Sequence, residues 1–399
     1  MEKDRRKSKL NLKVFSGKGG EKQGNMDMFL FNLVLVIFGF GLIMCFSASA
    51  PEGQKLFNDS YHFIRSQMIF GGIGFLGLLV ASHFNYHRYK KYLWIMVLVT
   101  IVLLIATQFF PAINGSQRWI RFGPFTFQPS ELAKITAIMW FAVHLSRQKL
   151  NYDRGIKAYF MSYLTDIILP YGIFLVIICA LLMLQPHFSC TLLILGTCSL
   201  MLFLSKSRLS HCLMTLAAGV PVLVVLALYG YRGDRMQSFL DPFASIQGDG
   251  WQVVQSYYAL GSGGFFGLGL GQSRQKFSWL PEQYNDFIYA VIGEELGFLG
   301  AVLVIVLFGL LIWRGLRIVK YAPDLLGKYI ALGITLLIAL QVTINLAVVT
   351  KVVPATGMPL PFFSYGGTAI MFTLIEMGIL LNISRSIDMP EFKKPHTKM

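Results

Sequence analysis

Charged side chains are scarce in this sequence, and their scarcity argues against a soluble protein. Only 14% of the 399 residues are Asp, Glu, Lys or Arg, whereas 55% are hydrophobic. An ordinary soluble domain carries about 25% charged residues. The composition therefore predicts a polytopic membrane protein, whose chain crosses a lipid bilayer several times.

Cysteine and histidine are also few, and their spacing fits no common metal site or disulfide framework. The five cysteines all fall in or at the ends of apolar stretches, so we expect them to pack as small apolar residues. None of the seven histidines forms an HExxH motif, and no Cys or His spacing resembles a zinc site. The sequence predicts no metal-ligand set.

Ten apolar stretches are long enough, or nearly so, to form the helix of about 20 residues that crosses a bilayer. They lie near residues 28–50, 67–84, 92–110, 128–146, 160–185, 188–205, 213–231, 287–313, 329–350 and 361–383. The expected fold is an all-α polytopic membrane protein with ten transmembrane helices. A membrane domain would span 28–385, between tails at 1–27 and 386–399, with a large extracellular loop at 232–285 between helices 7 and 8.

Basic residues outnumber acidic ones by 35 to 20, and their positions follow the predicted topology. With the N-terminus inside, 25 Lys and Arg residues fall in the inner segments and nine in the outer loops. This asymmetry follows the positive-inside rule, so we expect both termini in the cytoplasm. The net charge of +15 therefore does not require a nucleic-acid partner, and none is predicted.

Two predicted outer segments contain turn signals. Residues 111–130 alternate apolar and polar side chains, and the loop at 232–285 is far longer than an ordinary connection. Within that loop, residues 253–260 predict a short amphipathic helix on the outer leaflet. The glycine-rich run GSGGFFGLGLG (261–271) resembles a phosphate-binding loop, but no strand precedes it and nucleotides do not occur on that side of the membrane. We interpret it as a turned surface loop whose glycines would let a substrate approach the backbone.

The stretch WLPEQYNDFIYAVIGEELGFLG (279–300) places four carboxylates at the entrance of the eighth span: Glu282, Asp286, Glu294 and Glu295. Carboxylates in or beside a bilayer are costly unless they are paired, hydrated or used. On a helix, Asp286 and Glu294 would lie about 80° and about 12 Å apart, so the acids cannot all serve one site. We expect Asp286 in the first helical turn at the outer mouth, where helix capping is its alternative role. Glu294 and Glu295 should pack into the bundle.

Cationic residues surround this acidic mouth. The long outer loop contains Arg232, Arg235, Arg274 and Lys276. Mixed charges at one mouth suit an anionic, phosphate-bearing headgroup together with a hydroxyl that must lose a proton. In the fourth span, Glu131 and Lys134 are three residues apart and should pair, either as a structural ion pair or as the lining of a polar cavity.

Several motifs resemble the signatures of a known family. They are NGSQRWIRFGPFTFQPSELAKI, SFLDPF, GSGGFFGLGLGQSRQKFSWLPEQYNDFIYAVIGEELG and PATGMPLPFFSYGG. The chain resembles, over residues 28–385, the SEDS family (shape, elongation, division and sporulation), which includes FtsW, SpoVE and RodA, and is most similar to its FtsW type. The resemblance implies a peptidoglycan glycosyltransferase that polymerises lipid II at the outer face of the cytoplasmic membrane, at the division septum or in sporulation. It also implies a class B penicillin-binding protein, a transpeptidase, and other divisome proteins as partners.

The family's functional residues fall on particular positions of this chain. The acid of the LPE…DF motif falls on Asp286, and the arginine of SQRW falls on Arg118. The intramembrane acid and lysine of QPSELAK fall on Glu131 and Lys134, which we expect to contribute to substrate binding.

The reaction that the resemblance implies needs a base and positive charge. We expect Asp286 to be the general base for a sugar hydroxyl. Arg118, Arg274 and Lys276 would contact the departing diphosphate, and Ser364 in the SYGG motif would contact substrate as well. A divalent cation, magnesium or manganese, is a candidate helper, and no other cofactor is expected.

One position departs from the family pattern. After the fifth span this chain reads QPHFSC where the family usually reads close to QPDFGT, so His187 replaces a carboxylate. The family's role for that carboxylate is therefore not carried over to His187. Imidazole titrates near neutral pH, so the replacement would make activity more sensitive to pH.

Two alternatives to catalysis remain open. A lipid II flippase or transporter would use Glu131, Lys134 and the deeper acids as a polar path through the bundle. A non-catalytic scaffold would bind and activate the penicillin-binding protein.

Overall fold

The computed structural model describes residues 24–112, 115–123, 125–148, 161–205, 207–215, 217, 239–241, 250–277 and 279–387. Several sequence predictions lie outside these residues. They concern most of both tails, most of the stretch at 213–231, and the cations Arg232 and Arg235 in the long outer loop.

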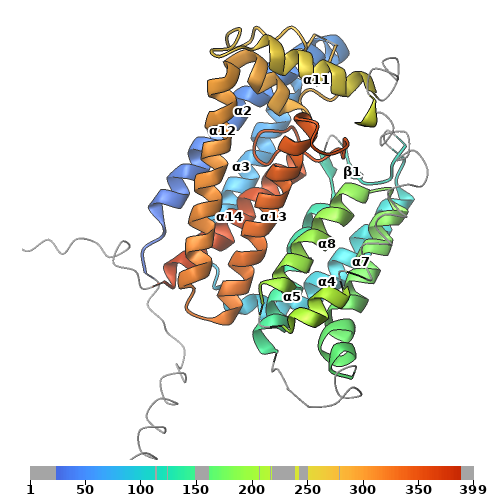
Figure 1. Ribbon diagram of the computed structural model, residues 1–399, viewed down its shortest axis with the longest axis vertical. Helices are drawn as coiled ribbons and strands as arrows, with labels where there is room; N and C mark the ends of the chain where they lie inside the picture. The colour runs from blue at the N-terminus through green and yellow to red at the C-terminus, as the bar shows by residue number, and fades with distance from the viewer. Residues whose placement is uncertain are drawn as a thin grey trace, which may run out of the picture.

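The described chain is a bundle of long apolar helices, with one helix lying across an end of the bundle (Figure 1). The helices are α2 (Met28–Phe57), α3 (His62–His83), α4 (Tyr89–Ala106), α5 (Pro129–Arg147), α7 (Ile173–Leu184), α8 (Phe188–Phe203), α11 (Gly250–Ser262), α12 (Ile288–Tyr321), α13 (Leu325–Val349) and α14 (Gly367–Arg385). Short 3-10 turns lie at η1 (Tyr86–Arg88) and η2 (Thr107–Phe109), and the π-helical segment η3 (Leu164–Gly172) leads into α7. Within the described residues, seven helical segments are long and apolar enough to cross a membrane. The polytopic helical fold is thus confirmed, while the number ten stays a prediction.

Burial separates the central helices from those at the periphery. In their most apolar windows, α14 is 78% buried and α13 is 61% buried, whereas the segments Tyr86–Phe109 and Met161–Leu184 are only 28% buried. Large apolar side chains such as Trp94, Val80 and Leu98 are exposed on the outside of the bundle. An apolar outer surface around a partly polar interior suits a protein whose surroundings are lipid.

The segment at 111–130 contains the only strands among the described residues. Strands β1 (Ile120–Phe122) and β2 (Phe125–Phe127) form an antiparallel hairpin in which Arg121 is opposite Thr126. The all-α prediction missed this hairpin because strands of three residues leave little periodic signal. The helix expected near 253–260 is present as α11, which lies across the same end of the bundle as β1 (Figure 1).

The two ends of the described chain lie together at the other end of the bundle (Figure 1). The amide of Gly24 donates to the carbonyl of Arg385 at 2.8 Å. Asp27 caps α2 and forms a buried ion pair with Arg314 on α12, with 2.6 Å between Oδ2 and Nε. The two described ends therefore share one end of the bundle, and their location in the cytoplasm stays a prediction.

A break inside α12 holds the glycine-rich run at 261–271 in place against that helix. Gly297 adopts φ 66° and ψ −163°, so the helical hydrogen bonding stops locally. The carbonyls of Glu294 and Glu295 instead accept from the amides of Leu268 at 3.0 Å and Gly269 at 2.9 Å. A Cβ atom at Gly267 would lie 2.2 Å from the Glu295 carbonyl oxygen. The glycines of this run therefore let the backbone of α12 pack closely against them. The sequence predicted that a substrate, and not another part of the chain, would make this close approach.

Candidate active site

Asp286 lies in the turn that leads into α12, and α11 packs against α12 at one end of the bundle (Figure 1). The helix begins at Ile288 and its N-cap position is Phe287. Asp286 therefore lies before the first turn, whereas the sequence predicted it within that turn. Its side chain is partly exposed, whereas Phe287 and Ile288 are buried. The structure thus places this carboxylate at the mouth of the bundle.

Three hydrogen bonds hold the backbone around Asp286. The Tyr284 carbonyl accepts from the amide of Tyr365 at 2.8 Å, and the Asn285 carbonyl accepts from Ser364 Oγ at 2.5 Å. The Asp286 carbonyl accepts from Asn345 Nδ2 at 2.8 Å. Three consecutive carbonyls are therefore fixed by α13 and by the segment that precedes α14. Such an arrangement limits how far the Asp286 side chain can move.

Asn345 and Gly357 are parts of this site that the sequence analysis missed. Asn345 is completely buried and also donates from Nδ2 to the carbonyl of Met358 at 2.8 Å. Gly357 has φ +69°, and a Cβ atom there would lie 3.3 Å from Asp286 Oδ2. The signal for this part of the site was the run of Pro and Gly residues in the last predicted outer loop (346–367), because irregular backbone at membrane depth is tolerated where it is buried in protein or lines a cavity.

Arg118 lies beside the turn between α7 and α8. Its Nε donates to the carbonyl of Gln185 at 3.3 Å, and Nη2 donates to that of Pro186 at 2.5 Å. Ser189 Oγ, in the first turn of α8, donates to the carbonyl of Thr356. Gly357 follows Thr356 in the chain and lies next to Asp286 Oδ2. The segment 356–357 therefore connects the turn that Arg118 contacts with the Asp286 carboxylate.

His187 belongs to the same turn as Gln185 and Pro186. Its side chain is buried, and this burial, with Arg118 and Lys134 nearby, holds the pKa of the imidazole well below its usual value. The ring is therefore neutral at neutral pH. The expectation that this histidine titrates near neutrality does not fit its surroundings.

Glu131 and Lys134 form the predicted ion pair. Lys134 Nζ lies 2.7 Å from Glu131 Oε2, and both side chains are buried within the bundle. A third charged side chain, Glu376 on α14, is also buried and interacts electrostatically with Lys134, and it was not among the predicted site residues. A lone carboxylate inside the last apolar stretch was the signal for it.

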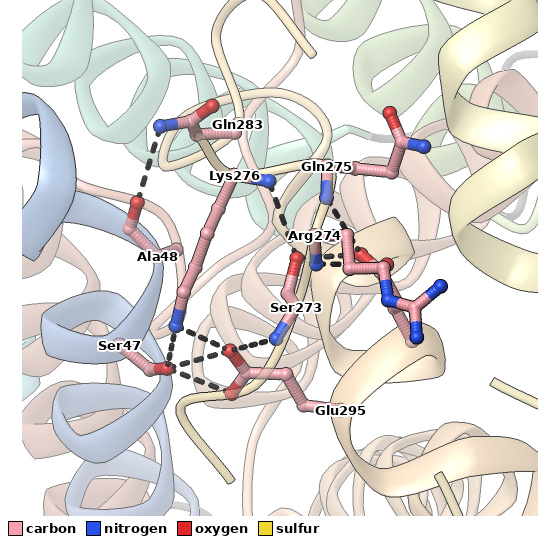
Figure 2. A network of polar contacts seen from close by, with 9 residues as sticks. Ser47, Ala48, Ser273, Arg274, Gln275, Lys276, Gln283 and Glu295 are labelled. Carbon is pink, nitrogen blue, oxygen red and sulfur yellow. Dashed lines mark hydrogen bonds and ion pairs between the residues drawn. The ribbon is translucent and has the colours of Figure 1, made fainter. Parts of the chain in front are cut away.

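Figure 2 shows a third buried ion pair, between Lys276 and Glu295. Lys276 Nζ lies 2.8 Å from Glu295 Oε1 and 3.2 Å from Ser47 Oγ on α2. Ser47 Oγ also donates to Glu295, with 2.7 Å to Oε2. Lys276 is 3% exposed and Glu295 is 0% exposed, so neither charge faces water. The pair joins the outer segment to α2 and α12.

Glu294 holds the residues that precede Lys276. Its carboxylate accepts from Ser273 Oγ at 2.5 Å, from the amide of Arg274 at 3.0 Å and from that of Gln275 at 3.3 Å. Hydrogen bonds from amide donors to a buried carboxylate satisfy its charge. The prediction that Glu294 and Glu295 pack into the bundle with hydrogen-bonded acids is thus confirmed.

The predicted substrate contacts fall into two groups. Arg274 is exposed, and its side chain points away from Lys276 (Figure 2). Lys276 instead neutralises Glu295, and Ser364 donates its hydroxyl to the Asn285 carbonyl while accepting from the amide of Leu360 at 2.7 Å. Lys276 and Ser364 are therefore placed to hold the outer segments in position.

Among the described residues, no group of three or more His, Cys, Asp or Glu side chains is arranged to hold a metal ion. The helices, the buried ion pairs and the partly exposed carboxylate together define a polytopic membrane protein with a polar site at one end of its bundle.

The chain belongs to the cell cycle protein family of FtsW, RodA and SpoVE, whose sequence profile matches residues 27–388. Stage V sporulation protein E of Bacillus subtilis is 39% identical over 369 residues, which cover 91% of this chain and 98% of that protein. A protein of Trichlorobacter lovleyi named probable peptidoglycan glycosyltransferase FtsW is 38% identical over 366 residues, covering 90% and 93% of the two chains.

Solved structures share the fold. A chain from a peptidoglycan synthase complex described as coordinating polymerization and crosslinking superimposes with a TM-score of 0.73 at 28% identity, covering 91% of this chain and 98% of that one. The rod shape determining protein RodA of Thermus thermophilus gives a TM-score of 0.66 at 24% identity, over 91% of this chain and 98% of that one.

Proposed function

We propose that this protein is a peptidoglycan glycosyltransferase that polymerises lipid II at the outer face of the cytoplasmic membrane, in septal or sporulation-associated wall synthesis. Membership of the family and the names of the relatives support the activity. The observation that carries the site assignment is the partly exposed Asp286, whose own carbonyl and the two before it are each fixed by a hydrogen bond.

In this reaction the 4-hydroxyl of one sugar attacks the anomeric carbon of another. A C–O bond forms at that carbon as the bond to the lipid diphosphate breaks. Asp286 accepts the hydroxyl proton as general base, and the diphosphate leaves with the bonding electron pair. A single displacement of this kind inverts the configuration at the anomeric carbon.

Positive charge stabilises the departing diphosphate. Arg274, which is exposed, and Arg118, which is half-buried at the same end of the bundle, supply guanidinium groups that bind phosphate oxygens in pairs. Lys276 acts on the site indirectly, by holding the segment that carries Arg274 against Glu295. A magnesium or manganese ion bound by the diphosphate would add charge stabilisation, and no step above depends on it.

The polymer that this site makes requires cross-linking by a transpeptidase. A class B penicillin-binding protein is the proposed partner, within a larger division assembly, and the likeness to a chain of a peptidoglycan synthase complex supports such a pairing. Both tails would then lie in the cytoplasm, with the α11 end of the bundle outside.

Polymerisation by the purified protein tests the proposal. The full chain is placed in lipid vesicles with fluorescent lipid II, and products are separated by length on a gel. Glycan strands are expected from the wild type and not from Asp286→Ala. A flippase would move the lipid between leaflets without forming polymer, and a scaffold would do neither.

A further inference from the structure

Several buried polar side-chain atoms close to the proposed catalytic mouth lack a hydrogen-bond partner among the described residues, including Gln185 Oε1 and Asn345 Oδ1. Three others lie on the elements that meet around the turn beginning at Gln185. They are His187 Nδ1, Ser130 Oγ and Thr356 Oγ1. His187 is 8% exposed and Ser130 is 0% exposed. A buried polar atom without a partner is destabilising, so several such atoms in one region suggest a bound group that would satisfy them.

Contacts between neighbouring elements bring the three atoms into one region. Cys190 Sγ, one turn after His187 on α8, lies 3.8 Å from the carbonyl oxygen of Ser130 on α5. Ser189 Oγ donates to the carbonyl of Thr356 in the last outer loop. The turn at 185–190 is thus in contact with both residues that carry the other unpartnered atoms.

The chemistry of these atoms favours an uncharged ligand. Two are hydroxyl oxygens, and the third belongs to an imidazole that burial and two nearby cations keep neutral by lowering its pKa. Each of these groups is able to donate or to accept a hydrogen bond from a ligand. Lys134, one of the two cations beside them, is already paired with Glu131 at 2.7 Å. Neutral donors and acceptors match sugar hydroxyl and acetamido groups better than they match a diphosphate.

We propose that His187, Ser130 and Thr356 form a saccharide subsite, which binds hydroxyl or acetamido groups of a sugar whose reacting atom lies at Asp286. The subsite rests on the proposed function and deepens it. Gly357 follows Thr356 and adjoins Asp286 Oδ2, so a sugar held by these three residues reaches the carboxylate across one residue of backbone.

The test measures ligand affinity without turnover. In an Asp286→Asn background, the full chain in vesicles is titrated with fluorescent lipid II and with undecaprenyl diphosphate, which lacks the sugars. His187→Leu is expected to weaken lipid II binding by about three- to tenfold, the effect of one lost neutral hydrogen bond, and to leave undecaprenyl diphosphate binding unchanged. His187→Asn, whose amide can occupy the position of Nδ1, should restore most of the affinity, whereas His187→Gln should not.

Thermal stability distinguishes ligand binding from a structural role. Removing an unpartnered polar atom should keep or raise the melting temperature, so His187→Leu should be stable and yet bind lipid II weakly. Thr356→Val provides a second, nearly isosteric variant with the same expectation. Thr197→Val is the matched control, because Thr197 Oγ1 is also buried and unpartnered but lies deeper on α8, and lipid II binding should not change.

Two outcomes overturn the subsite. The first is unchanged lipid II affinity in both His187→Leu and Thr356→Val, and the second is an equal loss for both ligands, which would assign the atoms to the diphosphate. Failure of the proposed function looks different, because the chain with Asp286 intact would then make no polymer at all.

Discussion

Replacing Lys276 with methionine should destabilise the fold far more than breaking a comparable ion pair at the surface. The Glu295 carboxylate, which is 0% exposed, would keep only Ser47 Oγ and the amide of Ser273 as partners. Removing one partner of a buried ion pair costs about 3–5 kcal/mol, because the remaining charge stays out of water. We expect a loss of that size in the free energy of unfolding.

The matched control is the pair between Arg65 and Asp59, which are 2.7 Å apart, with the Arg65 side chain 64% exposed. Arg65→Met should cost no more than about 1 kcal/mol, because water screens and solvates both charges. Denaturant titration of the two variants in detergent, followed by tryptophan fluorescence, measures both losses. Adding Glu295→Gln to Lys276→Met should recover much of the stability, since no unpaired charge then remains. Equal losses for Lys276→Met and Arg65→Met would refute the reasoning.

Three further predictions concern the mouth of the bundle. Gly357→Ala should slow polymerisation with little change in lipid II binding, because φ +69° costs an L-residue about 1–2 kcal/mol and the new methyl would lie 3.3 Å from Asp286 Oδ2; unchanged turnover would contradict this. Asn345→Leu removes the donor to the carbonyls of Asp286 and Met358. The turnover number in the vesicle assay should therefore fall by a larger factor than KM changes. A change in KM alone would show that Asn345 does not position Asp286. The lowered pKa of His187 means that the unfolded chain binds a proton below about pH 6.5 while the native chain does not, so unfolding free energy should fall as pH decreases through that value. His187→Asn should flatten this pH dependence, and an unchanged slope would show that another group causes it.

The sequence predicted those parts of the molecule that depend on local spacing or on composition. Apolar stretches of membrane length became helices, because a bilayer leaves the backbone few other ways to satisfy its hydrogen bonds. Glu131 and Lys134 were predicted to pair because residues three apart on a helix are neighbours. Asp286 was placed correctly at the mouth, although it lies before α12 and not in its first turn.

Contacts between distant segments could not be predicted in the same way. Nothing in the spacing of Lys276 and Glu295 indicates that one neutralises the other beside Ser47, since that depends on how the outer segment folds back onto α2 and α12. The break at Gly297 is equally hidden, because an isolated glycine in an apolar helix is common in membrane proteins. Asn345 acts on Asp286 across 59 residues of chain, beyond the reach of any periodic pattern.

Catalysis by Asp286 is tested most directly by comparing two acids in the same turn. Asp286→Asn and Glu282→Gln are each placed in vesicles with fluorescent lipid II, and glycan strands are counted by length over time. Glu282 is exposed and contacts Asn285 Nδ2 at 2.5 Å, a contact that glutamine can keep. We expect normal strands from Glu282→Gln and none above background from Asp286→Asn, although the latter should still bind lipid II. Strand synthesis by Asp286→Asn at the wild-type rate would contradict the role assigned to this carboxylate.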